Sequence, residues 1–374
     1  MGVRAPSAEI GFTVVGAGGG GLAMAGHLGL LGHPVRLLNR TPERVAAVAE
    51  RGGVELEGAL HGFGRVLAAG SEPDRLLEGS RLVMVVVPAH AHREVAAWIG
   101  PHLRPGQAVV LHPGRTLGAL EFEQALRSAG APPEVPVAEA QTLLYASRAV
   151  APGRVHVYQV KREVRLAALP AWRTGEVLEP LARALPQFVA APDVLATSLG
   201  NVGAIFHPAP TLLNLARIDA GEPFEYYRQG ISPAVARLLE ALDEERLAVA
   251  RALGVAAQSA RRWLEEAYGA AGDDLHGAIQ TNPAYEGIAA PASLPNRYIL
   301  EDVPTGLVPL VSLGRRMGVP VPLMEALVAL ACQVAGADLW ARGRTLENLG
   351  FDGAEQLLRY VREGGIRSWL PMPV

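Results

Sequence analysis

Short apolar runs in the first half of the chain alternate with segments of helical periodicity. The runs that predict buried strands are Phe12–Val15, Val35–Leu38, Leu82–Val87 and Ala108–Leu111. They are short and apolar at most positions, and most of their residues are aliphatic or β-branched. The helical segments around them are Leu22–Leu31, Pro42–Arg51 and His92–Ile99. Strands that alternate with helices are typical of a parallel, doubly wound sheet, so the sequence predicts an α/β domain at its start.

The pattern changes twice further along the chain. Within Arg154–Leu169 apolar residues recur at about every second position, which favours an antiparallel extension or hairpin. From about Asp193 onward helical patterns replace the strands, and Ser232 and Pro233 fit the N-cap and first residue of a helix. We expect a Rossmann-type domain over residues 1–190 and a mainly α-helical domain over residues 191–374.

Composition excludes several classes of partner. The 374 residues carry a formal net charge of −3, which gives no basic surface for nucleic acid. No apolar run approaches the roughly 18 residues that a membrane-spanning helix needs. Cys332 is the only cysteine, so an intrachain disulfide is excluded and a reducing cytoplasm is the expected location. The sequence is compatible with a homodimer but does not indicate one.

A glycine-rich segment directly follows the first predicted strand. Gly16, Gly18 and Gly21 fit the G-x-G-x-x-G pattern, and Gly19 lies inside it. The first glycine allows a tight turn, the second lets the backbone approach a pyrophosphate, and the third allows the helix to pack closely on the sheet. A strand before the loop and a helix after it are the context that this pattern requires. The segment therefore predicts a nicotinamide dinucleotide site rather than a flexible turn.

The residues after the second predicted strand bear on the choice of cofactor. NAD-binding sheets usually place Asp or Glu there, whereas this chain has Asn39, Arg40 and Thr41. Arg40 can pair with a 2′-phosphate, and Asn39 and Thr41 can donate hydrogen bonds to it. The sequence therefore favours NADP, with NAD as the alternative. The alternative interpretation of Arg40 is a solvated residue at a helix start.

Polar residues concentrate in three segments of the remaining chain. His207 precedes Pro208, which disfavours the α conformation at His207 and predicts a helix break there. A histidine in such a place either acts as an acid or base near neutral pH or fills a structural role. Asp302 can cap a helix or fix the tautomer of a histidine. Arg297 has the planar fork that suits a carboxylate.

The third segment, Glu139–Thr142, follows a predicted strand at Val135–Ala138. Ligands of open α/β sheets bind at the carboxyl ends of the strands, so Thr142 is a candidate contact.

Taken together, the chain resembles the octopine/nopaline (opine) dehydrogenase family along nearly its whole length. The motifs that carry the resemblance are GAGGGGLAMAGHL, HPGRTLGALEF, EAQTLLYASR, GNVGAIFHPAPTLLN, RYILEDVPTGLVPL and GRTLENLG. The resemblance implies NAD(P)H-dependent condensation of a 2-oxo acid, often pyruvate, with the amino group of an amino acid. It implies His207 as the acid/base and Asp302 as its partner. The implied substrate contacts are Arg297, Thr142, Arg115 and Asn201.

Two other classes of protein fit parts of the sequence. A 2-hydroxyacid or ketopantoate-type NADP-dependent reductase has the same domain order, but members of those families use a lysine near the start of the helical domain. Lys161 is the only lysine of this chain, and it lies in the alternating stretch instead. A cofactor-binding sensor without catalysis is the other class, because fold alone does not fix function. The joint presence of His207, Asp302 and Arg297 argues against it.

The amino substrate is not identified by any motif. We expect its pocket in the helical domain near Tyr226, Tyr227, Tyr285 and Glu286.

Overall fold

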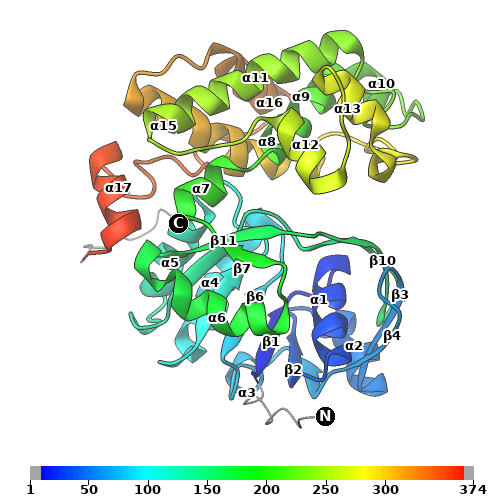
Figure 1. Cartoon of the computed structure of the whole chain (residues 1–374), viewed down its shortest axis with the longest axis vertical. Helices are drawn as coiled ribbons and strands as arrows, with labels where there is room; N and C mark the ends of the chain where they lie inside the picture. Colours follow the sequence, from blue (N-terminus) through cyan, green and yellow to red (C-terminus); the bar gives the residue numbers. More distant parts are fainter. Residues whose placement is uncertain (1–9, 366–374) are drawn as a thin grey trace, which may run out of the picture. The chain divides into compact units, whose positions relative to one another are not determined.

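The computed structural model describes residues 10–365, which form two compact units (Figure 1). The α/β unit comprises the described residues 10–114, 118–194 and 361–365, and the helical unit comprises 115–117 and 195–360. The tripeptide Arg115–Leu117 thus belongs to the helical unit, although it lies between a strand and a helix of the α/β unit.

An eight-stranded sheet forms the centre of the α/β unit, in the order β12-β11-β8-β7-β6-β1-β2-β5. Its strands are β1 (Phe12–Val15), β2 (Val35–Leu38), β5 (Ala68–Gly70), β6 (Leu82–Val85), β7 (Ala108–Leu111), β8 (Val137–Ala140), β11 (Val164–Leu169) and β12 (Phe188–Ala190). From β5 to β8 all neighbours are parallel, whereas β11 runs antiparallel to β8. The order reverses at β1 and β6, and sheets of this kind bind ligands beyond the carboxyl ends of such strands.

The helices of the α/β unit connect these strands. They are α1 (Gly19–Leu30), α2 (Glu43–Arg51), α3 (Pro73–Leu76), α4 (His92–Ile99), α5 (Gly118–Ser128) and α6 (Thr174–Ala184). Every residue of β1, β6 and β7 is buried. Strands covered on both faces need apolar side chains at every position, which is why these three strands stand out in the sequence.

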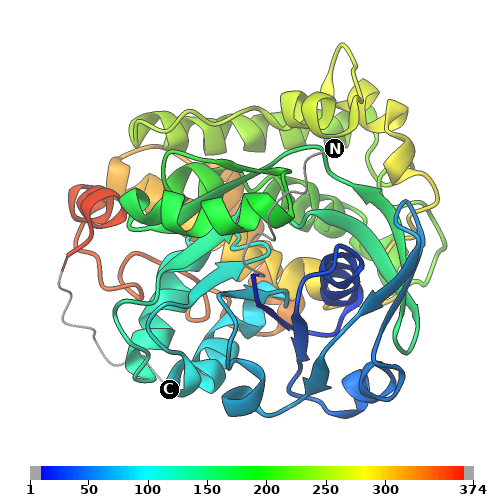
Figure 2. The ribbon, with the colours of Figure 1, turned by 60° about the horizontal axis from the view of Figure 1, so that its bottom comes forward.

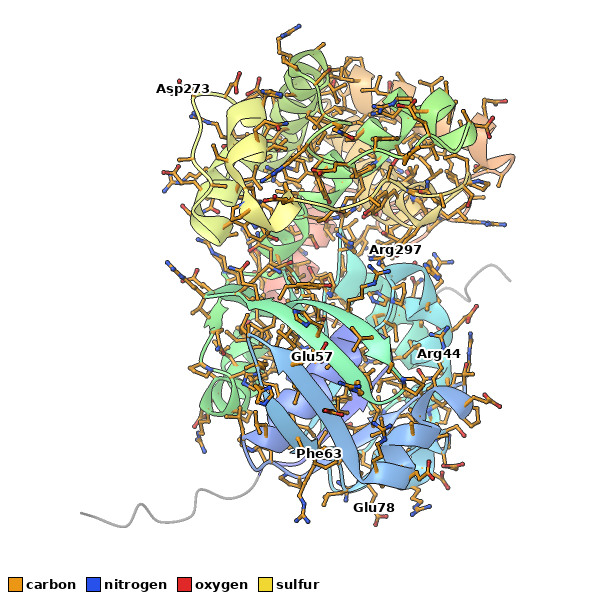
Figure 3. All side chains as sticks on the ribbon, turned by 90° about the vertical axis from the view of Figure 1, so that its right-hand side faces the viewer. Arg44, Glu57, Phe63, Glu78, Asp273 and Arg297 are labelled. Atoms are coloured by element: carbon orange, nitrogen blue, oxygen red, sulfur yellow. The ribbon has the colours of Figure 1, made fainter. Side chains whose placement is uncertain are left out.

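A second, four-stranded sheet lies beside α1, in the order β4-β3-β10-β9 (Figure 2). Its strands are β3 (Gly53–Gly58), β4 (Gly62–Arg65), β9 (Tyr145–Ala151) and β10 (Arg154–Val160). Figure 3 labels Glu57 on β3 and Phe63 on β4. A Cβ atom at Gly64 would lie 1.9 Å from the carbonyl oxygen of Gly26, so β4 and α1 meet at backbone distance. The glycine at position 64 is therefore required for this packing.

The helical unit contains the helices that follow the last strand. In chain order they are α7 (Val194–Leu199), α8 (Gly203–Phe206), α9 (Pro208–Leu213), α10 (Leu215–Asp219), α11 (Pro233–Ala252), α12 (Ala260–Tyr268), α13 (Leu275–Thr281), α14 (Arg297–Leu300), a π-helical turn η5 (Val303–Leu307), α15 (Val308–Met317), α16 (Pro322–Ala335) and α17 (Ala354–Glu363). The hydroxyl of Ser232 accepts a hydrogen bond from the Val235 amide at 3.3 Å and caps α11. No helix within residues 10–365 is long and apolar enough to cross a bilayer.

The predicted fold class is confirmed, with a few local differences. β1, β2, β7 and α4 have the predicted bounds. The strands β3, β4 and β5 were not predicted, because the segment 53–70 is rich in glycine and only partly buried. The alternating stretch Arg154–Leu169 forms two strands, each with an antiparallel partner: β10 pairs with β9 and β11 with β8.

One buried histidine of the α/β unit predicts acid sensitivity. His112 directly follows β7, and neither ring nitrogen has a hydrogen-bond partner among the described residues. Burial lowers the pKa of His112 from 6.5 to about 3. Between these two pH values the unfolded chain binds a proton that the folded protein excludes. Stability is therefore lost progressively as the pH falls below 6.5, by about 2 kcal/mol between roughly pH 7 and pH 5.

A substitution isolates this contribution. We expect His112→Phe, which keeps an aromatic ring against Phe188, to unfold in urea with a weaker dependence on pH than the wild type. His61→Phe replaces an exposed histidine and serves as the matched control, with an unchanged pH dependence. Equal pH dependence of the wild type and His112→Phe would contradict the assignment.

Candidate active site

The glycine-rich loop has the geometry of a dinucleotide cradle. Gly16 has φ +113°, in the region that favours glycine, and its amide donates to the Leu38 carbonyl oxygen at 2.8 Å. A Cβ atom at Gly21 would lie 1.9 Å from the Gly16 carbonyl oxygen, so the first turn of α1 closes directly on the loop. Gly18 is the N-cap of α1, and apart from its chain neighbours no atom of residues 10–365 lies within 4 Å of the position that its Cβ would take. The helix starts at Gly19 with its amides available for an anion.

The segment after β2 supports this loop. The side-chain oxygen of Asn39 accepts a hydrogen bond from the Ala17 amide at 3.1 Å, and its amide nitrogen donates to the Thr41 carbonyl oxygen at 2.9 Å. Arg40 forms an ion pair with Glu94, and both side chains are more than half exposed. Asn39 thus holds the glycine loop, while Arg40 and Thr41 lie at the surface.

His207 lies at the predicted break between two helices. α8 ends at Phe206 and α9 begins at Pro208, but the expectation that His207 avoids the α conformation is wrong. Its φ of −108° and ψ of −57° lie near the α region. The His207 carbonyl oxygen accepts hydrogen bonds from Tyr226 Oη at 2.6 Å and Thr211 Oγ1 at 2.8 Å, which hold this conformation. The backbone of His207 is therefore fixed from two sides.

The imidazole of His207 contacts Asp302. Its Nδ1 lies 2.9 Å from Asp302 Oδ2, and the Asp302 side chain is completely buried while that of His207 is 17% exposed. The ring also stacks on Tyr298, with centroids 4.4 Å apart. Asp302 makes no side-chain capping bond to the helical turn that follows it. A carboxylate on Nδ1 favours the tautomer that carries its proton there and leaves Nε2 as the reactive nitrogen.

Arg297 begins α14, one turn before Asp302. Its Nε donates to Glu301 Oε2 at 2.7 Å, with 60% of the side chain exposed (labelled in Figure 3). The pKa of Arg297 is raised: desolvation by burial would lower it, but the Glu301 carboxylate outweighs that effect. Arg297 is therefore a cation at the surface of the helical unit, and the buried carboxylate of Glu301 fixes its orientation.

Arg115 lies beside the carboxylates of Glu301 and Asp302, and Asn201 contacts Arg115. Arg115 Nη2 is 3.5 Å from Asp302 Oδ1, and its Nη1 donates to Asn201 Oδ1 at 3.2 Å. The Asn201 amide nitrogen donates in turn to Thr116 Oγ1 at 3.2 Å. Five predicted site residues, His207, Asp302, Arg297, Arg115 and Asn201, thus belong to one part of the helical unit.

Thr142 belongs to the α/β unit instead. It is half-buried in the segment after β8, and the neighbouring Leu143 carbonyl oxygen accepts a hydrogen bond from Lys161 Nζ at 2.7 Å. Lys161 therefore supports a loop of the α/β unit, far along the chain from the start of the helical domain.

Three residues around His207 were not predicted as site residues: Thr211, Tyr298 and Glu301. Tyr226, which was expected near the pocket of the amino substrate, donates to the His207 carbonyl oxygen. The Thr211 hydroxyl donates to the carbonyl oxygen four residues earlier, a local bond that threonine often makes in helices, so this contact was accessible from the sequence. Tyr298 carries no such local signal.

A dinucleotide-type glycine loop on a parallel sheet, with a His–Asp pair in a helical unit, defines a nicotinamide-dependent oxidoreductase of two-domain architecture. Comparison with known proteins identifies its kind. The profile of the family described as NAD/NADP octopine/nopaline dehydrogenase, alpha-helical domain, matches residues 190–335, and that of ketopantoate reductase PanE/ApbA matches residues 12–185.

Two individual relatives are similar in sequence over more than nine-tenths of the chain. Opine dehydrogenase of Arthrobacter sp. (strain 1C) is 42% identical over 364 residues, which cover 96% of this chain and 98% of that protein. Protein ocs of Agrobacterium tumefaciens (strain Ach5) is 28% identical and covers 91% and 96%. The chain belongs to the opine dehydrogenase family and is an NAD(P)-dependent opine dehydrogenase, which reductively condenses a 2-oxo acid with an amino acid.

Solved structures share the fold. An octopine dehydrogenase in complex with NADH and agmatine has a TM-score of 0.79 at 23% identity, with coverage of 93% of this chain and 98% of that one. An NADP⁺-bound yersinopine dehydrogenase has a TM-score of 0.70 at 16% identity and covers 95% and 98%. A PanE/ApbA-family ketopantoate reductase has a TM-score of 0.60. The alternative of a ketopantoate-type reductase thus reflects a shared architecture, whereas the full-length identity lies with opine dehydrogenases.

Proposed function

We propose that the enzyme uses NADPH to join pyruvate or a similar 2-oxo acid to an amino acid, with His207 as acid/base and Asp302 as its partner. The contact of 2.9 Å between His207 Nδ1 and Asp302 Oδ2 carries this proposal. It supplies an oriented titratable group in a helical domain whose described residues contain no lysine.

The glycine loop fits the pyrophosphate of the cofactor. The open space at Gly18 allows close backbone approach, and the amides at Gly19 and the following residues face that side of the helix start. Gly16 and Gly21 give the loop its shape. Asn39 holds the loop through the Ala17 amide, and Arg40 and Thr41 supply a cation and a hydroxyl for a 2′-phosphate.

The reaction follows from the chemistry of the substrates. The amine adds to the carbonyl carbon of the oxo acid, and the carbinolamine loses water to give an imine. The bound cofactor supplies the hydride that reduces the imine carbon, and the product is a secondary amine. His207 Nε2 accepts a proton from the ammonium form of the amino acid, which frees the neutral amine to attack, and then donates a proton to the departing hydroxyl. Asp302 stabilises the imidazolium form between these two transfers.

Three side chains are proposed as substrate contacts. Arg297 is an exposed cation that Glu301 holds in place, which suits a substrate carboxylate. Thr142 contributes a hydroxyl at the carboxyl end of β8. Asn201, which accepts a hydrogen bond from Arg115, completes the set. Fixed orientation of the carboxylate relative to His207 contributes much of the rate in such reactions.

The cofactor preference can be reversed at Arg40. We expect Arg40→Asp to lower the NADPH-to-NADH ratio of kcat/KM by roughly tenfold or more, because a charge-assisted hydrogen bond to phosphate is lost and a like charge is added. Steady-state kinetics with both cofactors measure the ratio. Arg51→Asp makes the same charge change at the far end of α2 and is the matched control. A ratio that Arg40→Asp leaves unchanged would remove Arg40 from the cofactor site.

Glu94 provides a second test of the same site. Its ion pair with Arg40 competes with a phosphate for the guanidinium group. We therefore expect Glu94→Gln to tighten NADPH binding and to leave NADH binding unchanged, as measured by titration calorimetry. Equal changes for the two cofactors would show that the pair acts only on the fold.

The product distinguishes the proposed reaction from simple keto-acid reduction. Mass spectrometry of a reaction with pyruvate and a mixture of amino acids should find secondary amines, each equal in mass to the two substrates minus water plus two hydrogens. Lactate as the only product would contradict the proposed function.

A further inference from the structure

The tripeptide Arg115–Leu117 adopts a backbone conformation that its residues disfavour. Arg115 has φ +65° and Leu117 has φ +57°, in the left-handed region that favours glycine. Such positions are strained and persist only where the surroundings hold them. Here two non-glycine residues of this kind lie within three positions. Two strained residues so close together indicate that neighbouring residues hold this segment in place, as is common near functional sites.

The helical unit holds the tripeptide through its backbone. The Thr116 amide donates to the Thr305 carbonyl oxygen at 3.1 Å, and the Leu117 amide donates to Ser198 Oγ at 3.0 Å. The buried side chain of Arg344 donates to the Thr116 carbonyl oxygen at 3.0 Å. These bonds fix the point from which the Arg115 side chain projects.

The guanidinium of Arg115 lies in a prepared place. Its side chain is 13% exposed, and Nη1 bonds Asn201 Oδ1 at 3.2 Å. A Cβ atom at position 203 would lie 2.3 Å from Nη1, so Gly203 leaves the space that the guanidinium fills. Arg115 Nε is 3.9 Å from Glu301 Oε1. The guanidinium is therefore surrounded by the open space at Gly203, the amide of Asn201 and the carboxylate of Glu301.

The Asp302 carboxylate has one neighbour for each oxygen. Oδ2 contacts His207 Nδ1 at 2.9 Å, and Oδ1 lies 3.5 Å from Arg115 Nη2. Oδ1 is buried and has no hydrogen-bond partner among residues 10–365, so the Arg115 cation is what balances it. Rotation of the carboxylate about its Cβ–Cγ bond would move Oδ1 away from Arg115 and Oδ2 away from His207 together. Both contacts therefore set the same torsion.

We propose that Arg115 is a positioning residue, which orients the Asp302 carboxylate and thereby keeps the proton of His207 on Nδ1. Arg115 acts on the reaction through Asp302 rather than by binding a substrate carboxylate, and the strained backbone at 115–117 is what places it there. This proposal rests on the proposed function of His207.

Glycine is the suitable replacement at this position. Because φ at Arg115 is +65°, Arg115→Gly removes the side chain and relieves the backbone strain, so the fold is not the weak point. We expect kcat to fall roughly 10- to 100-fold, because the Asp302 carboxylate loses the cation beside Oδ1. KM for the oxo acid should stay near the wild-type value. Guanidinium ion at non-denaturing concentration should restore part of kcat by filling the space beside Gly203.

Three further measurements separate positioning from other roles. Arg115→Lys should keep more activity than Arg115→Gly, because it retains the charge. In an Asp302→Asn background, Arg115→Gly should have little additional effect, since both changes act on one carboxylate. Nitrogen-15 NMR of His207 should show the Nδ1-protonated tautomer in the wild type and a mixture in Arg115→Gly. Arg217→Met, an arginine of the helical unit away from Asp302, is the control and should match the wild type.

A raised KM for the oxo acid at unchanged kcat would overturn the proposal and make Arg115 a substrate contact. Full additivity with Asp302→Asn, or an unchanged His207 tautomer, would also overturn it. If the wild type shows no amine-dependent turnover, the proposed function fails. If the wild type turns over and Arg115→Gly equals it, only the role of Arg115 fails.

Discussion

Replacing His207 with alanine should lower kcat/KM for reductive condensation by about 10²–10⁴-fold, the range typical of a general acid–base group. The expected loss of kcat/KM is large because the structure holds His207 in one orientation. His207 is fixed by its backbone bonds to Tyr226 and Thr211, by stacking on Tyr298 and by Asp302. Steady-state kinetics at saturating cofactor measure the effect. Cofactor affinity should remain unchanged, because no residue of the glycine loop is altered.

Asp302→Asn tests the second member of the pair. An amide in this place removes the buried charge that stabilises the imidazolium form, so we expect a loss of the same order as for His207→Ala. The double variant should be no worse than the more damaged single variant, because the two residues act as a unit. His276→Ala, which removes a half-buried histidine of α13, is the control with wild-type activity. Full turnover of both single variants would refute the assignment.

The second large effect is expected at Gly21. A methyl group there would lie 1.9 Å from the Gly16 carbonyl oxygen, so Gly21→Ala must displace the glycine loop or the start of α1. Overpacking of this kind typically costs about 1–3 kcal/mol of stability. We expect a lower melting temperature and a loss of measurable NADPH binding, because the displaced amides no longer face the pyrophosphate.

Two other glycines separate binding from folding. Gly18→Ala adds a methyl group where no protein atom lies within 4 Å, so the free protein should keep its melting temperature. NADPH binding should nevertheless weaken, because the cofactor needs this space. Gly175→Ala, at an open position of α6, should change neither property. Calorimetric titration and thermal melting of the three variants give the comparison. Wild-type NADPH affinity in Gly18→Ala would place the pyrophosphate elsewhere.

The parts of the fold that were predicted carry local signals. β1 and α1 could be recognised because a fully buried parallel strand is apolar throughout and the loop after it needs glycine at fixed positions. Ser232 and Pro233 specify the start of α11 by capping and by a fixed φ. In each case the physical requirement falls on neighbouring residues, so the sequence displays it directly.

The missing parts depend on contacts between distant positions. The segment around His207 was by itself compatible with both a structural and a catalytic role. The family resemblance implied Asp302 as its partner, and the geometry of that contact, between residues 95 positions apart, comes from the structure. Arg115 carries no sign of its positive φ, because arginine is not a residue that such turns select. β3 and β4 were not predicted because half-exposed, glycine-rich strands lack a strong alternation of apolar and polar residues. Such features require the assembled fold.

The dependence of NADPH oxidation on an amine tests most directly whether the enzyme condenses a 2-oxo acid with an amino acid. NADPH oxidation should be rapid with pyruvate and a suitable amino acid together, and much slower with pyruvate alone. A screen of oxo acids against amino acids with both cofactors identifies the best pair. Turnover should rise with amine concentration to saturation, and one secondary amine should form for each NADPH oxidised. Equal oxidation with and without any amine would contradict this expectation.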